Sequence, residues 1–396
     1  MYPPGYAARP FGYGPPRPFY PPYGPPSYGH IPPSFGRGGE EKRRPTLLRP
    51  QTFDQYMSQA EFPRNPEEDE ALNKAMLARN QQIAPSSIEQ SSATTLMTQV
   101  KAALETIIST QSIPSAKITE VKEVGSYKTG TMLTKKNIAD LVLVFSTLPT
   151  HQTVKALGEK IVEILKETQS GEIFGVVPRD YGCEVAGTQA VLRLMITVPS
   201  ELPLQLDSEL HLKPEILKKN MDALRHAHWF DENAGQPAIK MMVRIIKDIK
   251  NRCAGLQPLD IWTIELLSHY CVTYTPDRNP LPLADAFKRF FQLLSAGFLL
   301  HCAVAVADPC DPSRRINYGF SPADADLICR TAQFICRLVI HEKFERLFGL
   351  KNAHKDVANE NETDDSVNIA PLKEAYFDEF LVNKPDERKF GPRVTV

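Results

Sequence analysis

The chain has 396 residues, 42% of them hydrophobic, and its 46 basic and 47 acidic residues give a formal net charge of −1. This length suits one large domain or two medium ones with a sizeable core, and an average charge near zero says little about partners. No stretch reaches the roughly 18 apolar residues of a membrane span, and the N-terminus lacks the apolar core of a secretory signal. We therefore expect no membrane partner and no secretion.

Residues 1–50 form a low-complexity arm in which Pro, Gly and Tyr dominate. Such a composition buries too little apolar area to offset the entropy of ordering, so we expect disorder. Basic residues gather at its end, at Arg37 and at residues 42–44. Together with the tyrosines, they could stack on RNA bases and pair with phosphates, although a solvated tail is the plainer interpretation.

The next part, residues 51–200, alternates between expected helices and strands. Pro85 and Ser86 are a plausible helix start, and Leu141–Phe145 is apolar at each position, as in a strand buried on both faces. In chain order we expect a helix after Ser86, a strand into Gly125, the strand Leu141–Phe145, a helix over His151–Thr168, and strands over Cys183–Ala186 and Ala190–Val198. This order predicts an α+β fold with a mixed sheet.

After about Pro199 the pattern predicts helices only. The expected helices are Pro214–Trp229, Ala238–Cys253, Asp260–Tyr274, Pro282–Leu300 and a last helix that Ser321 caps, with Pro322 at its first position. The chain therefore divides into the arm, a mixed lobe over residues 51–200, a helical lobe over residues 201–350, and a polar tail over residues 351–396.

The most informative stretch is Val124–Phe145, VGSYKTGTMLTKKNIADLVLVF. Backbone amides at a Gly-Ser turn can hold phosphate, and Gly125 before Ser126 lets the chain approach closely. Asp140 then lies directly before the apolar run of the buried strand. We interpret these residues as the outline of a nucleotide site, while Asp140 could instead cap the strand or pair with a neighbouring lysine.

This stretch resembles the nucleotidyltransferase superfamily, which includes the oligoadenylate synthetases and poly(A) polymerases. There a Gly-Ser turn precedes a strand bearing Asp-x-Asp, and a later strand supplies a third acid. Asp140 matches the second Asp, Ile138 stands at the first, and Ala190–Val198 contains no acid. Two cations about 4 Å apart need several carboxylate oxygens. The resemblance therefore implies a pseudoenzyme with no catalytic residues and no metal.

Arg244 and Lys247 are three residues apart on one expected helix and so share a face. In the oligoadenylate synthetases a similar Arg-x-x-Lys helix faces the triphosphate. The match implies that both residues close over ATP or another ribonucleoside triphosphate, bound as a ligand and not required as a cofactor. The plainer interpretation is a solvated basic face, which Lys240 and Lys250 enlarge and which could attract nucleic acid.

Two further groups invite a metal interpretation and are given a structural one. His226 and His228 are two apart on an expected helix, so their rings diverge and should pack beside Trp229. The seven cysteines include no C-x-x-C pair. We expect reduced core thiols, neither zinc ligands nor disulfides.

A narrower resemblance spans about Phe53 to Leu350. Several segments, in this order along the chain, are similar to the DZF domain, the domain associated with zinc fingers. They are VGSYKTGTMLTKKNIADLVLV, LRHAHWFDENA, KDIKNRCAGLQPLDIWTIELLSHY and ADPCDP. That resemblance implies pairing through helical lobes with a DZF protein that carries double-stranded-RNA-binding domains. The last helix offers apolar residues for the interface: Phe334, Leu338, Phe344 and Leu347.

Two functions are consistent with these features. The first is an inactive nucleotidyltransferase-like subunit of a nuclear heterodimer, which could also enter cytoplasmic ribonucleoprotein complexes. It would act in RNA processing, RNA stability and transcription, and contact RNA mostly through its partner, with DNA as a further ligand. The alternative is an active, template-independent RNA nucleotidyltransferase whose missing acid is supplied by Asp180 or Glu184.

Overall fold

The computed structural model describes residues 66–169, 171–199, 210–275 and 279–350. The expected arm over residues 1–50 and the expected tail over residues 351–396 lie outside these ranges. Among the helices of the described ranges, none has both the length and the apolar character that crossing a membrane requires.

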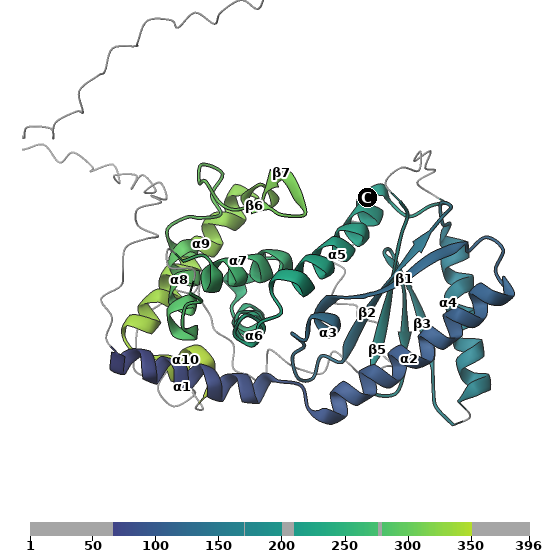
Figure 1. Ribbon diagram of the computed structural model, residues 1–396, viewed down its shortest axis with the longest axis horizontal. Helices are drawn as coiled ribbons and strands as arrows, with labels where there is room; N and C mark the ends of the chain where they lie inside the picture. Colours follow the sequence, from purple (N-terminus) through teal and green to yellow (C-terminus); the bar gives the residue numbers. More distant parts are fainter. Residues whose placement is uncertain (1–65, 170, 200–209, 276–278, 351–396) are drawn as a thin grey trace, which may run out of the picture. The chain divides into compact units, whose positions relative to one another are not determined.

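A five-stranded mixed sheet forms the centre of one lobe (Figure 1). Its spatial order is β1-β2-β5-β4-β3, with β2 and β5 parallel and the other neighbours antiparallel. The strands are β1 (Ile118–Val124), β2 (Ile138–Phe145), β3 (Gly175–Arg179), β4 (Gly182–Ala186) and β5 (Val191–Thr197). The predicted mixed sheet is confirmed, and β3 is a strand that its short, half-exposed sequence did not reveal.

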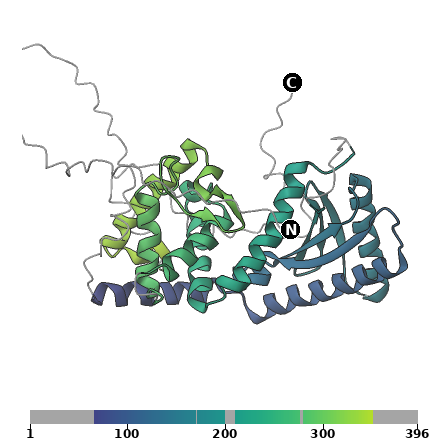
Figure 2. The same cartoon turned by 45° about the horizontal axis from the view of Figure 1, so that its top comes forward.

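Helices cover both faces of this sheet (Figure 2). α2 (Ser87–Thr110) and α4 (His151–Thr168) pack over one face and bury a core of aliphatic residues with it. α3 (Gly125–Thr129) and α5 (Pro214–Asn233) contact the strands as well, and α5 packs on β1, β2 and β5. Ser86 caps α2 through a capping box with Glu89, as the sequence predicts for a helix start there.

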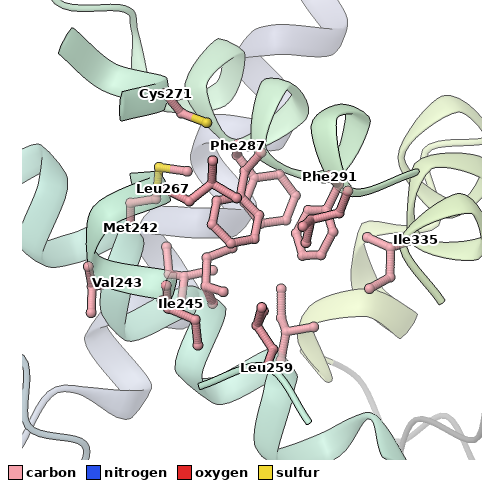
Figure 3. Packing of buried hydrophobic residues seen from close by; sticks show 14 of the residues in the cluster. Met242, Val243, Ile245, Leu259, Leu267, Cys271, Phe287, Phe291 and Ile335 are labelled. Carbon is pink, nitrogen blue, oxygen red and sulfur yellow. The ribbon is translucent and has the colours of Figure 1, made fainter. Parts of the chain in front are cut away.

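A second core lies among helices (Figure 3). It joins α6 (Pro237–Arg252), α7 (Ile261–Thr273), α8 (Leu283–Ser295), α9 (Pro322–Ile340) and α10 (Phe344–Phe348). Phe287 and Phe291 of α8 meet at its centre with ring centroids 5.0 Å apart, beside aliphatic residues such as Leu267 and Ile335. Aromatic pairs in this edge-on arrangement add to the stabilisation from burial.

One part of this lobe is not helical. A hairpin of β6 (Ala307–Asp308) and β7 (Asp311–Arg315) precedes α9. The expectation of helices alone after Pro199 is therefore wrong here. Pro309 and an aspartate favour a turn, because Asp308 Oδ1 accepts a hydrogen bond from the Cys310 amide at 2.9 Å.

Packing places the division between the lobes differently from the boundary expected at residue 200. α1 (Pro66–Ile83) buries Leu72 and Met76 in the helical core, whereas α5 packs on the sheet. A buried ion cluster fixes α1 there: Asp248 of α6 pairs with Arg79 of α1 at 2.7 Å and with Arg252 at 2.9 Å.

The predicted interface residues of the last helices require a correction. Leu338, Phe344 and Leu347 are buried in the chain's own helical core, because α9 and α10 turn these side chains toward the other helices. Phe334 is half-buried, and the guanidinium of Arg346 lies over its ring at 5.7 Å. Three of the four residues therefore stabilise the fold and offer no surface to a partner.

Candidate nucleotide-binding site

The expected Gly-Ser turn is the first turn of a short helix that follows β1 directly. Gly125 begins α3 with φ of +69°, a left-handed conformation that favours glycine. A Cβ added at Gly125 would lie 2.1 Å from Oδ2 of Asp140. The missing side chain is thus what lets the Asp140 carboxylate approach the start of α3, and the structure brings Gly125, Ser126 and Asp140 together.

Asp140 is buried and forms an ion pair with an arginine of the same chain. Nε of Arg193, on the parallel neighbour β5, donates to Oδ1 of Asp140 at 2.5 Å. The two residues are directly paired in the register of β2 and β5, so their side chains emerge on the same face of the sheet. The alternatives weighed from the sequence, a strand cap or a lysine partner, give way to this arginine pair.

The same row across the sheet includes Glu184, because Glu184 of β4 is paired in register with Arg193. Its carboxylate accepts from Arg179 at 2.8 and 3.0 Å and from the hydroxyl of Tyr181. Burial, and then the hydrogen bond to Glu184, raise the pKa of Tyr181. The Asp140 and Glu184 carboxylates are therefore both engaged by the chain's own donors.

This donor set does not fit the pair of cations that a nucleotidyltransferase uses. Ile138, two residues before Asp140 on β2, places hydrocarbon where the first carboxylate of the pattern would stand. On β5 the residue aligned with Asp140 is Arg193, so a positive guanidinium faces the carboxylate that would bind metal. Magnesium ions need clustered oxygen ligands and are repelled by a guanidinium.

Arg244 and Lys247 of α6 reach the loop that follows α3. Arg244 donates from Nη1 to the carbonyl oxygen of Gly130 at 2.8 Å, and Nζ of Lys247 donates to the carbonyl oxygen of Thr131 at 2.8 Å. Nε of Arg244 also donates to Asn80 of α1 at 2.9 Å. Both residues are half-buried, so the solvated basic face considered from the sequence is not what the structure shows.

The surroundings of Lys247 have opposing effects on its pKa. Burial lowers its pKa to about 8, and the nearby Glu265 and Asp140 carboxylates oppose that shift. Burial likewise raises the pKa of Glu265 to about 7, opposed by Lys247. Lys136 and Arg244 add positive charge beside Lys247 and favour its neutral form. An anion bound here would favour the protonated lysine.

The structure places Gly125 against Asp140 and brings Arg244 and Lys247 onto the loop after α3, and two residues that the sequence did not reveal, Arg193 and Glu265, interact with members of this set. Arg193 could have been found by aligning the two apolar strands, since a lone arginine interrupts the apolar run of β5. Glu265 lies in the middle of α7 among apolar residues, and nothing in its local pattern indicates which helix it faces.

The two histidines separate, as their spacing predicts. His226 stacks on the Trp262 indole, with ring centroids 3.8 Å apart and planes at 4°, and burial lowers its pKa. His228 is exposed and lies 3.5 Å from Glu232. The predicted packing of His226 beside Trp229 is indirect: His226 stacks on Trp262, and Trp229 meets Trp262 edge-on with ring centroids 5.2 Å apart.

Two protein-family matches cover most of the chain. Residues 39–235 match the DZF N-terminal domain, and residues 238–370 match the DZF C-terminal domain. The chain is a member of the DZF family. The boundary between the two DZF domains falls between α5 and α6, where the packing also passes from the sheet to the helical core.

Solved structures of nucleotidyltransferases share the fold of this DZF protein. CdnC of E. coli MS115-1, solved with ATP, is 15% identical, with a TM-score of 0.50 over 70% of this chain and 95% of that chain. The Cid1 poly(U) polymerase bound to MgATP is 13% identical, with a TM-score of 0.50 over 70% and 98% of the two chains. These likenesses confirm the predicted α+β nucleotidyltransferase-like fold, and at such identities they show the fold alone.

Proposed function

We propose that this DZF protein is a catalytically inactive nucleotidyltransferase-like subunit that retains a nucleotide site. The observation that carries the proposal is the Asp140–Arg193 pair. The carboxylate that matches the superfamily's metal-binding acid is held by a guanidinium, and Ile138 stands at the position of the other acid of the same strand.

The proposed ligand is ATP or another ribonucleoside triphosphate, held without a metal pair. Support comes from the start of α3, where Gly125 and Ser126 adjoin Asp140, and from the convergence of Arg244 and Lys247 on the following loop. Basic side chains and backbone amides are the groups that bind phosphate in the absence of metal. Arg193 pairs with Asp140, and its side chain, 38% exposed, offers further N–H donors beside that carboxylate.

An assay for nucleotide transfer tests inactivity. Purified protein with labelled ribonucleoside triphosphates, RNA and magnesium or manganese should incorporate no label and form no oligoadenylate. Incorporation that disappears in Asp140→Ala would overturn the proposal and favour the active alternative. That alternative already requires a free acid, and Glu184 is engaged by Arg179 and Tyr181, while Asp180 lies exposed beyond the end of β3.

The proposed biological setting is a nuclear heterodimer. Membership of the DZF family supports a DZF partner that carries double-stranded-RNA-binding domains and supplies most of the RNA contact, in RNA processing, RNA stability and transcription. Co-purification from nuclear extract, followed by RNA binding of the subunit alone and of the pair, tests this. An isolated subunit that is a stable monomer and binds duplex RNA as tightly as the pair would contradict it.

A further inference from the structure

Three side chains of different chemistry meet where α5 passes the β6–β7 hairpin. His226 of α5, Asp308 of β6 and Cys310 of the hairpin turn each offer one ligand atom, and these atoms all lie within 4.8 Å of one another. None of the three belongs to the nucleotide site residues described above. It also brings together two of the segments that distinguish the sequence, LRHAHWFDENA and ADPCDP.

Trp262 of α7 orients two of the three donors. The His226 ring lies flat against the Trp262 indole, which fixes the imidazole plane. Nε1 of the same indole donates to Oδ2 of Asp308 at 3.1 Å. A carboxylate has about four acceptor positions, so Asp308 keeps lone pairs for another partner after accepting from Trp262 and from the Cys310 amide.

The donor types indicate which ion would fit. One imidazole nitrogen, one thiolate sulfur and one carboxylate oxygen form a set that suits zinc and does not suit magnesium or calcium, which prefer oxygen alone. Ligand atoms of a tetrahedral zinc ion lie about 3.3–3.8 Å apart, so small rotations of the Cys310 and Asp308 side chains would complete the geometry. The surrounding charges are mixed: Asp222, one turn before His226, is negative, and Arg225 and Arg314 are positive.

We propose that His226, Asp308 and Cys310 bind a zinc ion with one coordination position left to water. This reverses the sequence-based expectation that the histidines and cysteines bind no metal. That expectation compared His226 only with His228, its neighbour on the helix, whereas the structure supplies the other ligands from a hairpin some eighty residues away in the chain. The bound ion would tie α5, which packs on the sheet, to the hairpin of the helical lobe.

Cobalt(II) substitution tests the site through the chemistry of its sulfur ligand. The full-length protein, stripped with a chelator, should bind one equivalent of cobalt and develop a thiolate-to-cobalt charge-transfer absorption that zinc then displaces. Cys310→Ser should lose this absorption, and His226→Gln should weaken zinc binding by at least about tenfold. Zinc in excess should also raise the melting temperature of the wild-type protein, because it binds the folded state.

Two matched variants separate this site from other thiols and imidazoles. Cys302→Ser removes an exposed cysteine outside the group, and His228→Gln removes the exposed histidine two residues along the same helix. Both should bind cobalt as the wild type does. Circular dichroism checks that Cys310→Ser and His226→Gln are folded. Absence of the absorption in the wild type, or its persistence in Cys310→Ser, would overturn the proposal.

Discussion

Asp248 and Asp140 are both buried aspartates paired with arginine, and their surroundings differ. Asp248 and its partner Arg79 have fully buried side chains, and Arg252 engages the second oxygen of Asp248. Asp140 is almost as buried, with 3% of its side chain exposed, but Arg193 keeps 38% of its side chain exposed. The first pair is enclosed within the helical core, while the second has one partner that faces solvent. Burial of both partners is consistent with a structural role, whereas the exposed part of Arg193 leaves the second pair accessible to a ligand.

The largest expected effect comes from breaking the enclosed cluster. Asp248→Asn leaves two buried arginines without a counter-charge and should destabilise the protein by about 3–5 kcal/mol. Asp140→Asn should cost less, because the solvent-exposed guanidinium of Arg193 can be rehydrated. Urea unfolding of both variants measures the difference. Equal losses would show that the two ion pairs do not differ as described.

A smaller loss of stability is expected from a substitution at Gly125, whose missing side chain makes room for the Asp140 carboxylate. Gly125→Ala forces a Cβ against the carboxylate and adds left-handed strain, which together should cost about 1–3 kcal/mol and abolish nucleotide binding. Gly130→Ala is the matched control. Its φ of +71° carries similar strain, but the nearest atoms to its added Cβ are those of the flexible Lys240 side chain at 3.6 Å. If Gly130→Ala were equally harmful to binding, strain alone would explain both variants.

The smallest effect concerns the pH dependence of nucleotide binding. Lys247 has a pKa lowered to about 8, so it is charged below that pH and neutral above it. Affinity for a triphosphate should therefore fall by roughly fivefold as the pH rises from about 7 to about 9, since a hydrogen bond from a charged donor contributes about 1 kcal/mol more than one from a neutral donor. Lys247→Arg, which stays charged, should bind with little pH dependence over this range. A wild-type affinity that does not change with pH would exclude Lys247 as a phosphate ligand.

Much of the fold could be predicted because local chemistry determines it. The apolar run Leu141–Phe145 within β2 indicated a strand buried on both faces, and Ser86 with Glu89 marked the start of α2 through bonds made within one turn. The hairpin β6–β7 was missed because its strands are short and mostly exposed, without the alternation of a half-buried strand. The burial of Leu338 and Phe344 depends on how α9 and α10 are turned against other helices, which a periodic pattern does not specify.

The candidate site likewise contains residues that could be predicted from the sequence and residues that could not. Gly125, Ser126 and Asp140 lie within one short stretch and could be recognised from it. The spacing of Arg244 and Lys247 gave only a shared helix face, and the resemblance to the oligoadenylate synthetases implied their place at the site. Arg193 and Glu265 belong to distant segments, so their proximity depends on strand register and helix packing. The same holds for Asp308 and Cys310 beside His226. Contacts between remote segments are what the sequence alone could not supply.

The most direct test of the central claim is calorimetric titration of ATP into the protein with chelator and again with magnesium. Because Arg193 already neutralises Asp140 and Ile138 offers no oxygen, the affinities in the two conditions should agree within about threefold, and Arg193→Met should weaken both. Binding that occurs only with magnesium, or no binding in either condition, would contradict the claim that this chain keeps a nucleotide site from which the metal pair has been lost.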